Sequence, residues 1–160
     1  MTKFQGLCAA AVAGLLMLAT PAAAQEVHLT AALTGGEETP GVLTGAVGSA
    51  SVTLDLTNKS VIVELQVLNM PTGSTAGHIH VGPKGIAGPV VLDFAFPAGR
   101  TGDFGLVFRL NSAQFRARPE IGIITIDDFF EAVINGNAYV NVHTSGFPGG
   151  EIRGQLVRVP

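Results

Sequence analysis

The 160-residue sequence contains one cysteine, no tryptophan and one tyrosine. The cysteine, Cys8, lies in the N-terminal leader described below, so the rest of the chain has no thiol for a disulfide or for Cys-His catalysis. Aromatic side chains are too few for an extended binding platform. Charged residues make up 13% of the chain and the net charge is −3, which gives no reason to expect nucleic acid or anionic lipid as a partner.

Two common functional motifs are also missing, the nucleophile elbow of serine hydrolases and the phosphate-binding loop. No serine lies in a nucleophile elbow. Residues 82–89 contain three glycines and two prolines, but no Gly-Lys-Ser or Gly-Lys-Thr follows them, which argues against a phosphate-binding loop. We therefore assign no catalytic residue and expect a protein that binds rather than catalyses.

The first 24 residues have the composition of a secretory signal peptide. Lys3 supplies a positive charge, residues 7–18 are apolar, and Ala22, Ala23 and Ala24 are small residues suited to cleavage. The apolar run is shorter than the roughly 20 residues of a membrane-spanning helix. We expect cleavage after Ala24, a secreted or periplasmic protein, and no membrane association once the signal is removed.

Period-two alternation of apolar and polar residues dominates residues 25–160, which we expect to form one domain. It is clearest at residues 47–56 and 61–68, which a four-residue polar connection should join into a β-hairpin. Further strands are predicted at residues 27–33, 77–81, 90–94, 104–110, 139–144 and 151–157. The fold class is therefore all-β, an antiparallel β-sandwich or Greek-key barrel.

One or two short helices are expected after residue 110. Ser112 is a candidate cap for a helix over residues 113–117, which Pro119 would end. Thr125 is a candidate cap for a second helix, which would run to about Ile134 with Asp127 and Asp128 near its positive end.

Three of the four histidines lie in two predicted strands. His78 and His80 share one face of the first strand, and His143 shares a face of the other with Tyr139 and Asn141. Because the intervening Ile and Val residues favour the core, all three imidazoles should face outward. If the two strands are neighbours, the rings can hold one copper or zinc ion, since imidazole binds both. The loop at residues 82–89 could roof this face.

A different use of the same face is equally open. Four other polar residues share it: Tyr139, Asn141, Glu151 and Arg153. They could form a structural polar network, or a surface for a protein partner, with no metal. Glu151 and Arg153 could form an exposed ion pair. The acidic pair Glu37 and Glu38 is interpreted as part of a solvated loop, with a Ca²⁺ site as the alternative.

Four segments together resemble the CHRD (chordin-type) domain. They are Gly77-His78-Ile79-His80-Val81-Gly82-Pro83, Gly88-Pro89-Val90-Val91, residues 135–144 (NGNAYVNVHT) and residues 148–156 (PGGEIRGQL). The resemblance covers essentially residues 27–159. It implies an extracellular or periplasmic β-rich domain, of a kind repeated in the growth-factor-binding protein chordin. The cysteine-rich modules of chordin are not found here, so growth-factor binding does not transfer.

The order of the histidines is also similar to that in copper-zinc superoxide dismutase. That family places a His-x-His pair on one strand and a further histidine on a late strand of a Greek-key barrel, where they bind copper. His78, His80 and His143 occur in the matching order. The zinc-binding histidines and aspartate, and the cysteine pair, have no evident counterparts. A copper-dependent enzyme is thus a second alternative.

Overall fold

The computed structural model describes residues 25–160, so the predicted signal peptide at residues 1–24 lies outside the described residues. Strands make up most of the regular structure, and no helix within residues 25–160 is long and apolar enough to cross a membrane. In chain order the elements are β1 (Glu26–Thr34), the 3-10 helix η1 (Gly35–Glu37), β2 (Val47–Asp55), β3 (Ser60–Met70), β4 (Ser74–Val81), β5 (Val90–Asp93), β6 (Gly102–Leu110), the 3-10 helix η2 (Pro119–Ile121), α1 (Ile126–Ile134), β7 (Ala138–Thr144), β8 (Ile152–Gln155) and β9 (Val157–Arg158).

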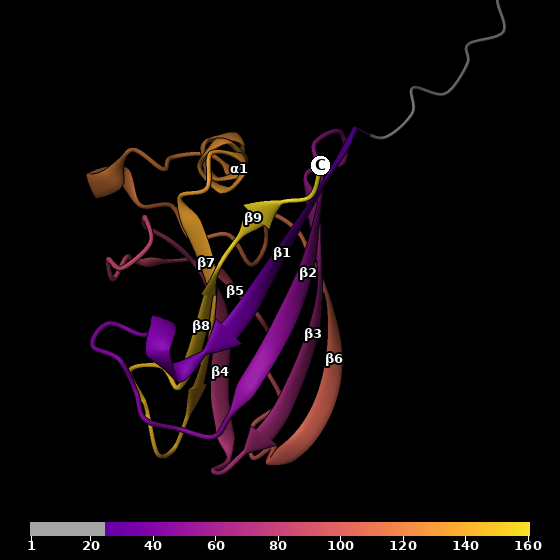
Figure 1. Cartoon of the computed structure of the whole chain (residues 1–160). Coiled ribbons are helices and arrows are strands. Elements are labelled where there is room, and N and C mark those ends of the chain that lie inside the picture. Colours follow the sequence, from indigo (N-terminus) through magenta and orange to yellow (C-terminus); the bar gives the residue numbers. More distant parts are fainter. Residues whose placement is uncertain (1–24) are drawn as a thin grey trace, which may run out of the picture.

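The strands form one antiparallel sheet that curls into a half-barrel (Figure 1). Their order across the sheet is β5-β4-β7-β8-β1-β2-β3-β6, with β9 paired to β1. The all-β prediction is therefore confirmed, as is the hairpin, in which Val52 of β2 lies opposite Val63 of β3. The order also makes β4 and β7 neighbours, although a long stretch of chain separates them.

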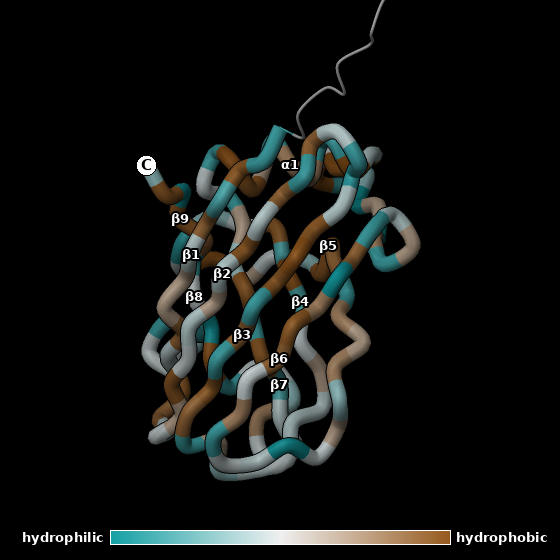
Figure 2. Tube along the Cα trace, turned by 90° about the vertical axis from the view of Figure 1, so that its right-hand side faces the viewer, coloured by the Kyte–Doolittle hydropathy of each residue, from teal (hydrophilic) through white to brown (hydrophobic). Residues whose placement is uncertain are grey.

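The inner face of the curled sheet is the hydrophobic core. Alternate residues of most strands are buried there. Figure 2 shows the corresponding alternation of hydrophobic and hydrophilic residues along the strands. Examples are Val52, Val63, Ile79, Val140 and Ile152, all 0% exposed. Burying one such aliphatic side chain contributes roughly 1.5–3 kcal/mol relative to leaving it in water. The period-two pattern of the sequence thus determines which side of each strand faces inward.

Helix α1 confirms the second predicted helix. Its N-cap is Thr125, whose hydroxyl accepts a hydrogen bond from the backbone N–H of Asp128 at 3.2 Å. The Asp128 carboxylate accepts in return from the backbone N–H of Thr125 at 2.7 Å. This capping box satisfies two N–H groups that the helix itself cannot pair. Phe129 and Phe130 are buried and fasten the helix to the core.

The first predicted helix, over residues 113–117, is wrong. This segment runs beside the outer edge of β5. The backbone N–H of Asp93 donates to the carbonyl of Gln114 at 3.1 Å, and the N–H of Arg116 donates to the carbonyl of Val91 at 2.8 Å. Backbone partners on a neighbouring strand therefore replace the helical hydrogen bonds that a local cap would have favoured.

Candidate metal centre

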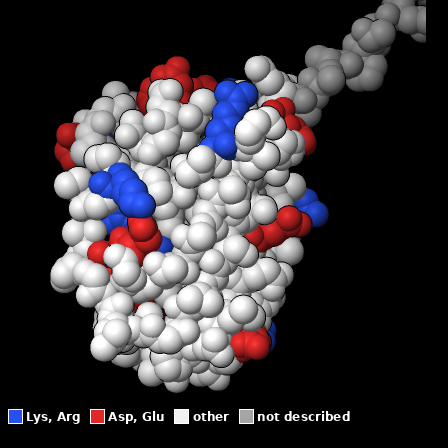
Figure 3. Space-filling view, viewed as in Figure 1, with Lys and Arg blue, Asp and Glu red and all other residues white. Residues whose placement is uncertain are grey.

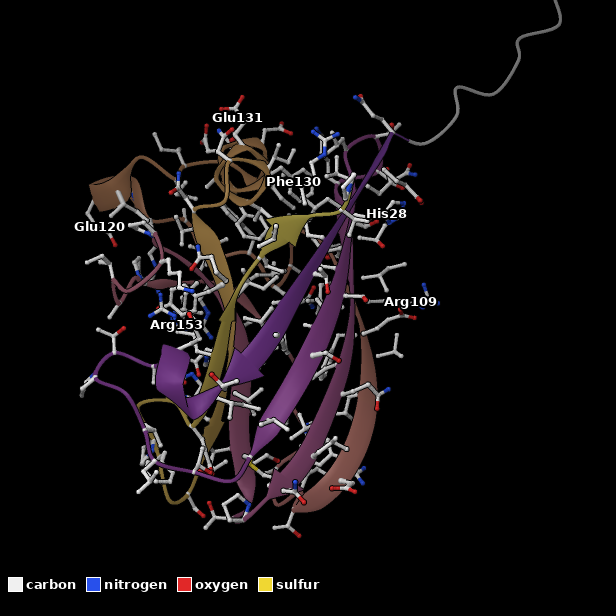
Figure 4. The ribbon with its side chains drawn as sticks, viewed as in Figure 1. His28, Arg109, Glu120, Phe130, Glu131 and Arg153 are labelled. Atoms are coloured by element: carbon white, nitrogen blue, oxygen red, sulfur yellow. The ribbon has the colours of Figure 1, made fainter. Side chains whose placement is uncertain are left out.

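The three histidines predicted as ligands come together on the outer face of the sheet. His78 and His80 lie on β4, and His143 lies on β7, the adjacent strand. The register places Asn141 opposite His78 and His143 opposite Ala76, so His143 lies diagonally beside His78. One nitrogen from each ring can be chosen so that all lie within 4.8 Å of one another. The fourth histidine, His28, lies on β1 near the far end of the sheet (Figure 4).

The prediction that these rings face outward is correct in direction, but the rings are not open to solvent. They do point away from the core, but His80 is 8% exposed, His143 is 9% exposed and the side chain of His78 is 15% exposed. Loops at residues 35–45, 82–89 and 145–150 gather on the left side of Figure 1, beside β4, β7 and β8. Two of them contact the rings, through the carbonyls of Gly88 and Pro148. The loop at residues 82–89 thus covers His80.

The ring of His80 is oriented by that loop. Its Nδ1 lies 2.9 Å from the carbonyl oxygen of Gly88. Because a carbonyl only accepts, Nδ1 carries the proton and Nε2 keeps a lone pair. This Nε2 is buried and has no hydrogen-bond partner among residues 25–160. At Gly88 a Cβ would lie 1.9 Å from the carbonyl oxygen of Val81, so only glycine allows the loop to approach this closely.

The ring of His143 is oriented in the same way by a second loop. Its Nδ1 lies 2.9 Å from the carbonyl oxygen of Pro148, so this nitrogen donates and Nε2 is left with a lone pair. That Nε2 lies 3.1 Å from Nδ1 of His78. Two neutral rings at this distance share one proton, which His78 must supply from Nδ1. A metal ion that replaces this proton would find a nitrogen lone pair from each ring.

The carboxylate of Asp93 lies next to the ring of His78. Nε2 of His78 lies 3.7 Å from Oδ1 of Asp93, which is opposite His78 in the β4–β5 pairing. The other oxygen of Asp93 forms an ion pair with Arg116. When Nδ1 of His78 is used as a ligand, the proton moves to Nε2 and faces this carboxylate. Such a partner favours the ligating tautomer and makes the ligand nitrogen more basic.

Burial keeps the three imidazoles neutral at pH 7. It is the main cause that lowers the pKa of His78 to about 4 and that of His80 to about 4. The pKa of His143 is also lowered, again mainly by burial, which the hydrogen bond to Pro148 partly offsets. Neutral imidazole is the form that binds a metal ion, so little proton competition is expected at this pH.

The spacing of the nitrogens fits a shared ion after a small adjustment. Metal–nitrogen bonds of about 2 Å hold ligand nitrogens roughly 3–4 Å apart. The 3.1 Å between His78 and His143 lies in this range. The limit of 4.8 Å for the whole set means that the widest pair needs to close by at most about 1 Å to enter this range. The residues present therefore suit copper or zinc with three nitrogen ligands.

An aromatic stack supports His80 from the side. The ring of Tyr139 lies parallel to it, with centroids 4.8 Å apart and planes 9° apart. The guanidinium of Arg153 lies 3.4 Å from the centroid of Tyr139. Because β7 lies between β4 and β8, Tyr139 lies between His80 and Arg153. Arg153 also donates to the carbonyl of Ile86 at 2.9 Å, which ties the covering loop to the sheet. In Figure 4, Arg153 lies on the side of the molecule where the loops gather.

The predicted ion pair between Glu151 and Arg153 is not present within residues 25–160, and neither residue is exposed. Glu151 is 0% and Arg153 is 2% exposed. The Glu151 carboxylate accepts hydrogen bonds from Thr44 at 2.6 Å and Thr144 at 2.5 Å. The expectation failed because alternation along a strand gives the direction of a side chain, whereas the covering loops determine its exposure.

Glu38 departs from the expectation of a solvated acidic pair. Its carboxylate packs against Asn141, whose amide donates to it at 3.3 Å, and burial raises the pKa of Glu38 to about 7. Its neighbour Glu37 forms an ion pair with Lys84 on the covering loop. Both acidic residues thus hold loops together rather than facing water alone.

Sequence reasoning missed Asp93 and Arg116 as supporting residues. A usable signal was present for Asp93, because a hairpin between residues 77–81 and 90–94 places Asp93 across from His78. No comparable local signal existed for Arg116, which reaches Asp93 only because residues 113–116 follow the edge of β5.

Comparison with known proteins supplies a family. The model of the CHRD domain matches residues 29–156, which is nearly the whole described chain and includes all three histidines. No curated protein and no solved structure matches this chain. The resemblance in the four sequence segments is therefore confirmed by the family model, and the chain belongs to the CHRD domain family.

Proposed function

We propose that this CHRD domain is an exported binding module whose residues His78, His80 and His143 hold one copper or zinc ion. The observation that carries the proposal is the cluster of three imidazoles, in which one nitrogen from each ring lies within 4.8 Å of the others. Nδ1 of His78 and Nε2 of His143 are 3.1 Å apart, and Nε2 of His80 is buried without a partner among the described residues. Each ring has a second contact, to Asp93, Gly88 or Pro148, that orients it. Export rests on the leader at residues 1–24.

The ligand chemistry favours a divalent ion. Three imidazoles without a sulfur ligand suit Cu²⁺ or Zn²⁺ better than Cu⁺, which prefers thiolate and thioether groups. Between the two, the general order of affinities places Cu²⁺ above Zn²⁺. We assign no catalytic residue, because loops cover the rings and the carboxylate beside them, that of Asp93, is already paired with Arg116.

A metal-free scaffold is the second candidate function, and one observation favours it. The covered face is already held by a network of its own: Glu151 joins Thr44 and Thr144, and Arg153 joins Tyr139 and the carbonyl of Ile86. Such a network can fix loops that a protein partner recognises, with the histidines serving only as hydrogen-bonding groups.

Calorimetry separates the two functions. Isothermal titration and thermal melting with Cu²⁺ and with Zn²⁺ should show one bound ion and a higher Tm for the wild type, because an ion that binds only the folded state stabilises it. The triple variant H78A/H80A/H143A should lose both effects, and His28→Ala should keep them, since His28 lies away from the site. A wild-type Tm that neither ion changes would contradict the metal function. The scaffold function predicts instead that the triple variant melts earlier than the wild type without any metal.

A further inference from the structure

The two edge strands of the sheet, β5 and β6, differ in whether another segment of backbone covers their outer side. The outer side of β5 is covered by residues 113–116, through the backbone hydrogen bonds of Asp93 and Val91. Strand β6 pairs with β3 on one side, and on its other side no strand or loop backbone within residues 25–160 pairs with residues 103–110. In Figure 1, β6 forms the right margin of the sheet with no strand beyond it. An open edge of this length presents free N–H and C=O groups to which another strand can add.

The outward side chains of β6 complement those of a second β6 strand placed antiparallel to it. Asp103, Gly105, Val107 and Arg109 are exposed and alternate with residues that face inward. Asp103 and Arg109 lie at equal distances from Leu106 in the sequence, and so do Gly105 and Val107. An antiparallel pairing of two β6 strands, with the two-fold axis at Leu106, would therefore place each Asp103 opposite an Arg109 and each Val107 opposite a Gly105.

Within the described part of the chain, the charges of Asp103 and Arg109 have no partner of opposite sign. Among residues 25–160, neither Asp103 nor Arg109 forms an ion pair, although Asp103 accepts a hydrogen bond from the backbone N–H of Asn69 at 2.8 Å. Arg109 points away from the sheet in Figure 4. Val107 is 59% exposed. On the face that Figure 3 shows, Lys and Arg side chains are interspersed with Asp and Glu side chains.

We propose that β6 pairs antiparallel with β6 of a second copy of this chain, about a two-fold axis at Leu106, to join two half-barrels into one continuous sheet. A strand from another protein could also add to the edge. The second copy is favoured because the pattern of Asp103, Gly105, Val107 and Arg109 is self-complementary, as an isologous two-fold contact requires. The contact lies on the side of the molecule opposite the loops that cover the histidines (Figure 1), so it does not depend on metal binding.

Sedimentation equilibrium of the full-length chain tests the proposal, with a chelator present so that no metal bridges two copies. The wild type should form a dimer. Arg109→Asp, or Asp103→Arg, places like charges opposite each other twice and should raise the Kd by about tenfold or more. The double variant D103R/R109D exchanges the signs across the axis and should return the Kd to within about threefold of wild type. The control Arg158→Asp removes an exposed arginine of β9 and should leave the Kd unchanged.

Hydrogen exchange on the wild type provides a measurement that needs no variant. Half of the amides of residues 103–110 face the open edge and should become protected as the concentration rises through the Kd. A wild type that stays monomeric up to about millimolar concentration would overturn the proposal. So would a dimer in which these amides gain no protection, or one whose Kd is the same in both single variants as in the wild type.

Discussion

Oδ1 of Asp93 lies 3.7 Å from Nε2 of His78, on the side of the ring away from the nitrogen that faces His143. The carboxylate belongs to β5 and reaches the histidine only because β5 pairs with β4. With this arrangement, Nδ1 of His78 is available to bind the metal ion, while Nε2–H faces the carboxylate.

The first prediction concerns that carboxylate. Asp93→Asn keeps the shape of the side chain but removes the negative charge that faces Nε2 of His78. We expect the affinity for Zn²⁺ or Cu²⁺ to fall by about 10–100-fold. Titration calorimetry measures the change. The control Asp127→Asn makes the same substitution at an exposed residue that pairs with Lys59. Equal affinities for Asp93→Asn and the wild type would show that Asp93 does not orient His78.

The second prediction concerns pH and Glu38. Burial raises the pKa of Glu38 from 4.5 to about 7, while Arg153 and Asn141 partly offset this effect. The folded state then binds the Glu38 proton more tightly than the unfolded state does. The contribution of Glu38 to the free energy of unfolding is therefore complete at low pH, and it is lost as the pH rises toward about 7. Glu38→Gln should remove this loss.

Urea denaturation at several pH values tests this effect. The difference in unfolding free energy between Glu38→Gln and the wild type should grow from acid to neutral pH in favour of the variant. Glu37→Gln is the matched control, because Glu37 is the adjacent residue and pairs with Lys84 at the surface. A constant difference across the pH range would contradict the raised pKa.

The third prediction concerns the close approach of the covering loop. A methyl group in Gly88→Ala would lie 1.9 Å from the carbonyl oxygen of Val81, so the loop must move and the hydrogen bond to His80 must stretch. We expect a loss of about 1–3 kcal/mol of stability, as for other overpacked sites, together with weaker metal binding. Gly45→Ala, where a Cβ has no neighbour within 4 Å, is the control. Denaturation and metal titration of both variants test this prediction. A Gly88→Ala variant with the stability and metal affinity of the wild type would contradict it.

The fourth prediction concerns the start of α1. Thr125→Ala removes the hydroxyl that accepts from the backbone N–H of Asp128, and should cost about 1 kcal/mol of stability. Thr125→Ser keeps a hydroxyl at the same place and should recover most of this loss. Metal affinity should not change in either variant, because the site lies on β4 and β7. Thermal melting without metal measures the stabilities, and equal values for Ala and Ser would argue against the cap.

Local patterns were sufficient for most elements of the fold. The alternation around Val52 and Val63 predicted the hairpin, because the direction of a side chain along a strand repeats every two residues whatever the partner. Thr125 predicted α1 because a cap acts within one turn. The helix predicted after Ser112 failed for the opposite reason: its backbone partners, Asp93 and Val91, belong to a distant strand that no local pattern specifies.

Some features of the candidate site likewise follow from the sequence, and others depend on the tertiary structure. The sequence by itself determined that His78 and His80 share a face, and that His143 lies on the same face of its own strand as Asn141, because both follow from strand pleating. Only the tertiary structure decided that β4 and β7 are neighbours in a register that brings His143 beside His78. It also decided that two loops contact the rings of His80 and His143 and orient them. Strand order and loop packing depend on contacts between residues far apart in the chain, and a local pattern carries no information about such contacts.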